Sequence, residues 1–383
     1  MKIAIVHNSY GKRSGEEVVV EMQTSLLRRN GFDVCSFARS SEEISKKRFG
    51  KFNAFLSGIY NPFSNAKFKK FLEKEKPDVV HIHNLYPLIS PSVLSVARQM
   101  EIPVAMTVHN YRLVCPNGLY FSHGEVCERC EGSREYWCFL RNCEEDWFKS
   151  FGYFLRSWWA RKMGYFTKNV TTFLCLTQFQ CERLVKGGIN RSKVKILPNS
   201  IPIRSLEKTE GPGEYVAFAG RLSIEKGAST LLEVARNNTD ITFAVAGPYD
   251  DFEANPAPNV KLLGQLDGHQ MADFYSKAKC LIVPSICFEG FPMVVLEAMM
   301  QAKPVVCSRI GGLPDIVEDG VVGLLAEAGK ASDFGRQIRK LWDDPDLCLK
   351  LGTAARRRVL HEYSIAKYYE ELQGIYLGVE SNG

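Results

Sequence analysis

Two glutamates flank the start of a predicted helix in the second half of the chain. Glu289 lies in the loop before this helix and Glu297 lies within it. Pro292 suits the first turn, because no partner is needed there for the N–H that proline lacks. The free backbone amides around this start, those of residues 290, 291 and 293, then form the positive end of the helix dipole, which can bind an anion. The carboxylates could accept hydrogen bonds from vicinal hydroxyls of a sugar and a ribose, although the pattern also fits a capped surface helix with solvated glutamates.

A second candidate site lies in residues 220–227, Gly-Arg-Leu-Ser-Ile-Glu-Lys-Gly, directly after a predicted strand. Arg221 offers a planar fork of donors and Lys226 a point charge, so the two could clamp a diphosphate. Two solvated surface cations are the alternative interpretation. A third glycine turn, in residues 311–320, opens another predicted helix.

The elements that must position these residues alternate between short apolar strands and amphipathic helices. Strands are predicted at Lys2–Val6, Val79–His83, Val104–Val108, Thr172–Leu176, Tyr215–Ala219, Thr242–Ala246, Val260–Leu263, Cys280–Val283 and Pro304–Ser308. Helices are predicted at Glu17–Arg29, Pro91–Met100, Ala228–Arg236, His269–Lys277 and Ile365–Leu377. Strands that alternate with helices favour parallel sheets, and the length of 383 residues suits two doubly wound α/β domains.

The composition excludes several other classes of protein. The chain contains 23 Phe, 15 Tyr and 5 Trp, which is too much apolar surface for a disordered chain. It has no run of about 20 apolar residues that could span a membrane. The apolar run at the amino terminus is too short for a signal peptide, so we expect a cytoplasmic protein.

Charge is distributed unequally between the two halves. Residues 1–200 carry 30 Lys and Arg against 18 Asp and Glu, a net charge of +12, whereas residues 201–383 carry 19 against 25, a net charge of −6. The basic half could face nucleic acid, an anionic membrane or a phosphorylated acceptor.

Two stretches of the basic half mix cations with aromatic residues. Residues 46–76 carry a net charge of +7 with seven interleaved aromatic residues, and residues 151–168 include Trp158, Trp159, Arg161 and Lys162. This pattern suits a surface that binds anionic lipid, but a charged helix face that covers core aromatics is equally consistent with it. We do not expect nucleic-acid binding, because the aromatics form no recognisable sheet motif.

Taken together, the ordered motifs resemble the retaining family 4 glycosyltransferases of GT-B fold (glycosyl transferases group 1). The resemblance covers nearly the whole chain. It rests on Gly-Arg…Lys-Gly at 220–227, Glu-x7-Glu at 289–297, Gly-Gly-x-Pro-Asp-x-Val-x-Asp-Gly at 311–320, Ser-Gly-Glu at 14–16, Pro-Asp-Val-Val-His-Ile-His at 77–83, Thr-Val-His-Asn at 107–110 and Leu-Pro-Asn-Ser-Ile at 197–201. Ser14 and Ser200 depart from the family pattern, in which glycine is more usual at both positions.

The resemblance implies an α/β protein of GT-B fold, with two Rossmann-like domains that face a cleft. We expect an amino-terminal acceptor domain over residues 1–198 and a carboxyl-terminal nucleotide-sugar domain over residues 199–364. The polar stretch near residues 199–214 is the linker. Residues 365–383 are expected to form a helix that crosses back onto the first domain.

The resemblance also implies a role for each matching residue. Arg221 and Lys226 would neutralise the diphosphate of the donor without a divalent metal ion, and no Asp-x-Asp triplet stands where it could hold one. The other expected contacts are Glu297 with the ribose, Glu289, Gly290 and Phe291 with the transferred sugar, Gly15 with the phosphates, and His109 with the donor sugar.

The implied reaction transfers a sugar from a nucleoside-diphosphate sugar to a saccharide or lipid-linked acceptor with retention, through a front-face step with no protein nucleophile. Cell-surface polysaccharide, lipopolysaccharide or glycolipid synthesis would be the setting, with the enzyme peripheral at the inner membrane face. The alternatives are a non-catalytic nucleotide-sugar-binding scaffold and a sugar-nucleotide epimerase of the same fold. A pyridoxal-type phosphorylase would need a Schiff-base lysine motif, which we do not find.

Two further histidines, His81 and His83, lie on the predicted strand that precedes His109. We expect them to point to opposite faces of the strand and therefore not to share a metal ion. Both are interpreted as structural or as lining the cleft.

A cysteine-rich insert occupies residues 115–143 and holds five of the 12 cysteines. Cys127 and Cys130 have the spacing of a zinc knuckle, and Cys115 and Cys143 could complete four thiolates. The resemblance supports this set, because family members with a similar insert carry cysteines at these places; Cys138 is the spare candidate. Free buried thiols are the alternative, and disulfides are less expected in a reducing cytoplasm.

We therefore predict a structural zinc ion in the insert, which has little apolar surface of its own to bury. Metal analysis of the purified protein should find about one zinc per chain. A fully folded protein without metal would contradict the prediction.

Overall fold

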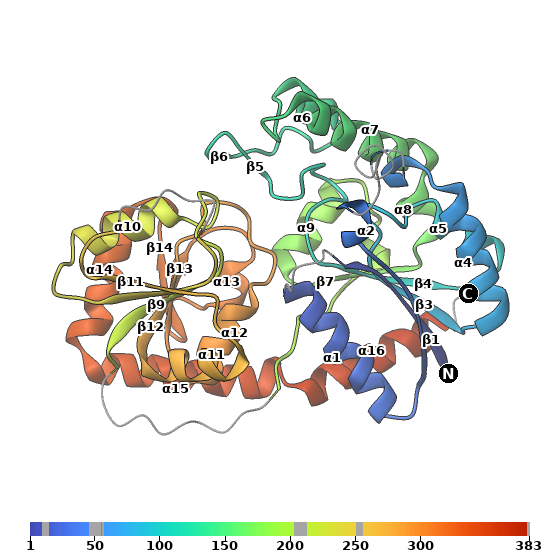
Figure 1. The fold of residues 1–383 in the computed structure, drawn as a ribbon. Helices are drawn as coiled ribbons and strands as arrows, with labels where there is room; N and C mark the ends of the chain where they lie inside the picture. Colours follow the sequence, from blue (N-terminus) through green and yellow to red (C-terminus); the bar gives the residue numbers. More distant parts are fainter. Residues whose placement is uncertain (10–14, 46–54, 56, 203–212, 250–255, 381–383) are drawn as a thin grey trace. The chain divides into compact units, whose positions relative to one another are not determined.

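The computed structural model describes the chain except for residues 10–14, 46–54, 56, 203–212, 250–255 and 381–383 (Figure 1). The described chain forms two compact units. Unit 1 comprises residues 1–122, 127–198 and 368–383, and unit 2 comprises residues 123–126 and 199–367. The main division therefore falls between Pro198 and Asn199, where the sequence places the domain boundary, and the end of the last helix belongs to unit 1.

Unit 1 is built on a six-stranded parallel sheet with the order β2-β1-β3-β4-β7-β8. Helices cover both faces of its central strands, and every residue of β3, β4 and β7 is buried. The strands are β1 (Lys2–Ser9), β2 (Asp33–Ser40), β3 (Val79–Asn84), β4 (Val104–Val108), β7 (Thr172–Cys175) and β8 (Val194–Ile196). A separate short hairpin joins β5 (Phe121–Ser122) and β6 (Glu125–Val126).

The helices of unit 1 are α1 (Gly15–Arg29), α2 (Glu42–Ser45), α4 (Pro62–Glu75), α5 (Val93–Gln99), α6 (Tyr136–Leu140), α7 (Trp147–Met163), α8 (Tyr165–Asn169), α9 (Gln178–Lys186) and the 3₁₀ turn Arg191–Lys193. The helix α16 (Ile365–Glu380) contributes its residues from Tyr368 onward. One apolar cluster joins α4, α5 and α9 to the sheet, and a second joins α1 and α16 to the opposite face.

Unit 2 repeats this architecture with the strand order β11-β10-β9-β12-β13-β14, again all parallel. This is the order of the Rossmann fold, in which the chain runs outward from the centre in both directions. The strands are β9 (Tyr215–Ala219), β10 (Phe243–Ala246), β11 (Val260–Gly264), β12 (Ala278–Val283), β13 (Val305–Ser308) and β14 (Gly323–Ala326). The helices are α10 (Ala228–Arg236), α11 (Gly268–Lys277), α12 (Met293–Met300), α13 (Leu313–Ile316), α14 (Ala331–Asp343) and α15 (Pro345–Glu362).

Parallel strands all end at the same edge of a sheet, and ligands of such folds bind where the strand order reverses. In unit 2 the order reverses between β9 and β12, so the loops after these two strands lie side by side. In unit 1 it reverses between β1 and β3. The topology therefore selects one edge of each sheet as the place for a site.

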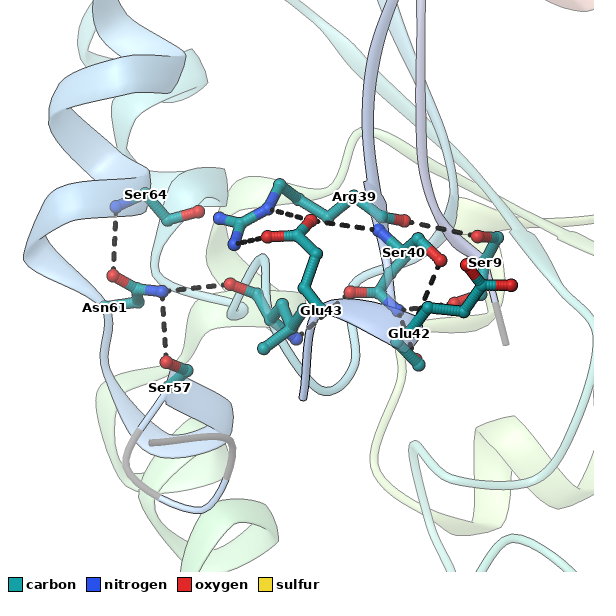
Figure 2. Close-up of polar contacts among 11 residues, drawn as sticks. Ser9, Arg39, Ser40, Glu42, Glu43, Ser57, Asn61 and Ser64 are labelled. Carbon is teal, nitrogen blue, oxygen red and sulfur yellow. Dashed lines mark hydrogen bonds and ion pairs between the residues drawn. The ribbon is translucent and has the colours of Figure 1, made fainter. Parts of the chain in front are cut away.

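The carboxyl end of β2 in unit 1 is held by short polar contacts (Figure 2). Arg39 binds the Glu43 carboxylate of α2 with both Nε (2.8 Å) and Nη2 (2.6 Å), and the Ser40 amide donates to the same carboxylate at 3.3 Å. Nearby, Asn61 caps α4 by accepting a hydrogen bond from the Ser64 amide at 3.0 Å. These contacts define the paths of α2 and α4 as they leave this edge of the sheet.

His81 of β3 connects the last helix to the core of unit 1. Its Nδ1 lies 2.6 Å from Tyr376 Oη and 3.0 Å from Gln23 Nε2, and its Nε2 lies 2.8 Å from Thr107 Oγ1. Tyr368 donates to Gln23 Oε1 at 2.7 Å, so both tyrosines of α16 belong to the same network. His81 is fully buried, and burial lowers its pKa to about 3. A neutral His81 is therefore part of what holds α16 to α1 and the sheet.

The prediction that His81 and His83 point to opposite faces of their strand is wrong. Their rings stack with centroids 4.6 Å apart and planes 4° apart. Residues two apart on a strand share a face, because side chains alternate with a period of two.

We predict that acid destabilises the fold through these buried histidines. Below pH 6.5 the unfolded chain binds protons at His81 that the folded chain does not bind until about pH 3. Stability is therefore fully present above about pH 6.5 and falls by up to about 1.4 kcal/mol per pH unit for this one group as the pH is lowered. Urea unfolding of the wild type and of His81→Asn between pH 5 and 7 should show a shallower slope in the variant.

The exposed His269 supplies the control for this experiment. His269→Asn should keep the slope of the wild type. Equal slopes for His81→Asn and the wild type would contradict a neutral, buried His81.

Candidate functional site

The loop after β9 crosses the sheet edge in close contact with the loop after β12. Gly227 has a φ of +77°, and a Cβ there would lie 1.9 Å from the carbonyl oxygen of Pro284. The Ile286 amide also donates to the carbonyl oxygen of Glu225 at 3.0 Å. The glycine that ends the 220–227 motif is therefore required for this close approach, which brings Lys226 beside Glu289.

Lys226 and Glu289 form a direct ion pair, although 63 residues separate them in the sequence. Lys226 Nζ lies 2.7 Å from Glu289 Oε1, and the Ser285 hydroxyl donates to the same oxygen at 2.6 Å. The side chain of Glu289 is only 10% exposed and that of Lys226 is 35% exposed. Two donors on one oxygen fix the orientation of the carboxylate.

Both members of this pair are charged at neutral pH. Burial opposes the charge of Glu289, but the Lys226 ammonium and the hydrogen bonds from Lys226 and Ser285 outweigh it and lower the pKa of Glu289. Burial likewise opposes the charge of Lys226, and the Glu289 carboxylate outweighs it and raises the pKa of Lys226. The site therefore holds a fixed positive charge and a fixed acceptor side by side.

Arg221 lies at the other end of the same loop and has a weaker partner. Its Nη2 contacts Glu225 Oε1 at 2.8 Å, four residues away in sequence; the Arg221 side chain is 56% exposed and that of Glu225 is 16% exposed. Because solvent reaches the guanidinium, we expect this pair to be worth only about 0.5 kcal/mol. Arg221 therefore has the more solvent-accessible of the two pairs.

The helix expected to offer an anion site, α12, starts one residue later than the sequence analysis assumed. The helix begins at Met293, so Pro292 is the residue before it, with an extended backbone, and not part of its first turn. Phe291 is buried against Tyr363, with ring centroids 5.5 Å apart. Gly290 and Phe291 therefore remain at the amino end of α12, where the sequence placed them.

The third glycine motif, residues 311–320, contacts the backbone of Glu289. The Gly312 amide donates to the carbonyl oxygen of Glu289 at 2.8 Å. Gly311 has a φ of +60°, and a Cβ there would lie 2.7 Å from the backbone nitrogen of Glu289. The sequence identified this turn only as the opening of a helix; the structure shows that it packs on the backbone of the candidate ligand.

Glu297 of α12 is held by a residue that the sequence analysis did not identify. Tyr275 of α11 donates its hydroxyl hydrogen to Glu297 Oε2 at 2.8 Å. Tyr275 is buried, and burial together with the neighbouring carboxylate raises its pKa well above the ordinary value. It therefore remains a hydrogen-bond donor at neutral pH and orients the carboxylate that is expected to bind ribose.

In unit 1, His109 directly follows β4 and lines a pocket at the carboxyl edge of the sheet together with His83, Thr107 and Arg112. His109 Nε2 lies 2.8 Å from His83 Nδ1. Burial and the neighbouring His7 lower the pKa of His109 to about 3, so the ring is neutral. Gly15 is the exposed first residue of α1; residues 10–14 before it lie outside the described residues.

In the cysteine insert, Cys115 lies beside Cys130, and Cys138 beside Cys143, so the spare candidate Cys138 is one of the thiols that meet. Within the described ranges no group of three or more His, Cys, Asp or Glu side chains is arranged to hold a metal ion. Zinc remains a prediction for metal analysis.

Three residues missed by the sequence analysis thus position the candidates: Ser285 holds Glu289, Tyr275 holds Glu297, and Glu225 holds Arg221. Ser285 and Glu225 are close in sequence to the residues that they hold, and this proximity was a usable signal. Tyr275 lies on another helix, and no local pattern connects it with Glu297.

The two parallel α/β units define the class of the protein, and comparison with solved structures shows it to be the GT-B fold. Sucrose-phosphate synthase from Thermosynechococcus elongatus is similar over 100% of both chains, with a TM-score of 0.73 and 16% identity. HepE from Anabaena, solved in complex with UDP-glucose, is similar over 99% of this chain and 100% of that chain, with a TM-score of 0.70 and 15% identity. At these identities the likeness concerns the fold alone.

The sequence also matches two family models, which cover consecutive parts of the chain. Glycosyltransferase Family 4 matches residues 13–204, half of the chain, and Glycosyl transferases group 1 matches residues 203–358. The chain belongs to glycosyltransferase family 4.

Among curated relatives, an uncharacterised glycosyltransferase of Methanocaldococcus jannaschii is 30% identical over 54% of this chain and 62% of its own length. An uncharacterised protein of the cps region of Klebsiella pneumoniae is 26% identical over 68% of this chain and 65% of its own length. The glycogen synthase of Mycobacterium tuberculosis is 23% identical over 75% of this chain and 66% of its own length. The chain thus spans about two thirds or less of these relatives.

Proposed function

We propose that this protein is a glycosyltransferase that uses a nucleoside-diphosphate sugar, and that it transfers the sugar with retention. The observation that carries the proposal is the constellation at the strand-order reversal of unit 2. There a fixed Lys226–Glu289 pair, a movable Arg221 and the amino end of α12 lie on loops that the fold brings together. The UDP-glucose complex of HepE, which has the same fold, supports a nucleotide-sugar donor.

Each group has a distinct task in this proposal. Arg221 leaves Glu225 for the diphosphate, and Lys226 keeps its bond to Glu289 while its other two hydrogens remain for phosphate oxygens. Together they stabilise the negative charge that develops on the leaving diphosphate. Glu289 and the amides of residues 290 and 291 bind the transferred sugar, and Glu297 binds the ribose.

The remaining parts of the proposal follow the family resemblance. His109 contacts the transferred sugar, Gly15 lets the first loop approach the phosphates, and no protein nucleophile takes part. The two cationic side chains make a catalytic divalent ion unnecessary. The acceptor is a saccharide or a lipid-linked saccharide of a cell-surface polymer.

Thermal stabilisation by a panel of uridine, guanosine and adenosine diphosphate sugars tests the donor site. One nucleotide class should raise the melting temperature, and the shift should survive a chelator. Glu297→Ala should weaken the shift. Tyr275→Phe should also weaken it, and more for the ribonucleotide sugar than for its 2′-deoxy counterpart. The reason is that the tyrosine acts through the carboxylate that is proposed to bind the ribose hydroxyls.

A product assay with the stabilising donor then separates the proposal from a non-catalytic scaffold and an epimerase. Transfer to an acceptor with the anomeric configuration of the donor supports the proposal. Binding without turnover would support the scaffold, and an altered free sugar nucleotide would support the epimerase.

We also propose that unit 1 binds an anionic membrane surface through α6 and α7. No helix among the described residues is long and apolar enough to cross a membrane. However, α7 contains seven aromatic residues and no acidic residue, and Leu140, Trp147 and Phe148 are each more than half exposed. Exposed aromatic and basic side chains on one helix suit the boundary between lipid headgroups and acyl chains. Residues 46–54 and 56 of the other basic-aromatic stretch lie outside the described residues.

Co-sedimentation with vesicles that contain anionic lipid tests this surface. The wild type should bind in a salt-sensitive manner, and Leu140→Ser combined with Trp147→Ser should weaken binding at least about tenfold, because two apolar side chains no longer insert. Leu349→Ser in unit 2, which removes a leucine that is 68% exposed, is the matched control and should bind as the wild type does. Equal binding of the double variant and the wild type would contradict the proposal.

A further inference from the structure

His83 and His109 share a hydrogen bond whose direction decides what His109 can offer a ligand. Strands β3 and β4 are paired in parallel, so these two side chains at their carboxyl ends come together. His83 Nδ1 lies 2.8 Å from His109 Nε2, and the ring centroids are 5.1 Å apart. One hydrogen lies between the two nitrogens, and it belongs to one ring or the other.

Both rings are neutral, so each carries a single N–H. Burial lowers the pKa of His109 to about 3, and burial and the neighbouring imidazoles lower that of His83 well below its usual range. If one ring donates the shared hydrogen, the other must carry its own hydrogen on its remaining nitrogen.

The surroundings of His83 Nε2 distinguish the two arrangements. This atom is buried and has no hydrogen-bond partner among the residues that the structure describes. If His109 were the donor, His83 would hold its hydrogen on Nε2, as a buried N–H without an acceptor. If His83 is the donor, Nε2 is a bare acceptor, and buried acceptors without a partner are less rare than buried donors without one.

The neighbouring histidines do not supply the missing acceptor. Nδ1 of His81 is engaged with Tyr376 and Gln23, and its Nε2 is engaged with Thr107, so neither nitrogen is left for His83. The ring of His7 meets that of His83 edge to face, with centroids 6.4 Å apart. Both ring nitrogens of His7 also lack a hydrogen-bond partner among the described residues, so His7 offers no acceptor within hydrogen-bond distance of His83. Donation by His83 is therefore the arrangement that leaves His83 itself without a buried N–H that lacks an acceptor.

We infer that His83 is a positioning residue that holds His109 in the Nδ1–H tautomer. His109 then presents a hydrogen-bond donor, and not a base, to the pocket that it lines. The ligand atom that it suits is an oxygen with a lone pair, and under the proposed function, on which this part rests, that oxygen is a hydroxyl of the transferred sugar.

Nitrogen-15 NMR of the full chain with labelled histidine tests the tautomer without any assay of activity. The His109 signals are identified by their loss in His109→Asn. The expected spectrum has the hydrogen of His109 on Nδ1, and a hydrogen on Nε2 would overturn the inference. The wild-type spectrum alone decides, so the test does not depend on whether a His83 variant folds.

A matched pair of variants tests the positioning role. His83→Asn places an amide N–H near the position of Nδ1 and should keep the tautomer and turnover within about threefold of the wild type. His83→Leu removes the donor, should move the His109 hydrogen toward Nε2, and should lower kcat about 100-fold with a smaller change in KM. If Asn and Leu at position 83 lower kcat equally in folded proteins, His83 has only a packing role.

The background of His109→Asn completes the experiment, because an asparagine amide offers a donor whatever occupies position 83. In that background His83→Leu should lower kcat no further. If no donor is turned over by any variant, the proposed function fails, whereas the tautomer is still decided by the spectrum.

Discussion

The order of the strands in the unit 2 sheet reverses between β9 and β12, and the positions of the charged groups of the candidate donor site depend on this reversal. Because the two strands are neighbours and parallel, the loops that leave them start side by side at one edge. Lys226 comes from one loop and Glu289 from the other, and Gly227 lets the two backbones approach closely enough for the ion pair to form. Without the reversal the same residues would lie apart at the ends of distant strands.

The strength of each ion pair follows from its burial, and the difference matters for the proposed chemistry. The Lys226–Glu289 pair is largely buried and supported by Ser285, so removal of either partner would leave an uncompensated charge. The Arg221–Glu225 pair, whose arginine is open to solvent, adds little net stability, and the proposal has it exchanged for a ligand. One loop thus supplies both a fixed and an adjustable positive charge.

The candidate site of unit 1 contains neutral histidines, whereas that of unit 2 contains charged side chains. Its central strands carry buried histidines that stay neutral because burial opposes their protonation. One of them, His81, joins α1 and α16 to the sheet, and the next, His83, contacts the candidate residue His109. The same strand therefore carries one histidine that stabilises the fold, His81, and one that lines the pocket, His83.

Much of the architecture could be predicted from the sequence. The strands Val104–Val108 and Tyr215–Ala219 and the helix Ala228–Arg236 have the predicted bounds, because apolar runs and helical periodicity are local signals. Strands β2 and β14 were not predicted: β2 is a partly exposed edge strand with a mixed sequence, and β14 is only four residues long.

The sequence by itself determined the fold class, the family and the residue types at the candidate donor site, since these depend on ordered motifs. Only the tertiary structure decided which side chains meet. The Glu289–Lys226 and Glu297–Tyr275 contacts and the contact of His83 with His109 were settled there. The physical reason is that hydrogen bonds and ion pairs require separations of about 3 Å, and strand order, helix packing and backbone turns set these separations between segments distant in the chain.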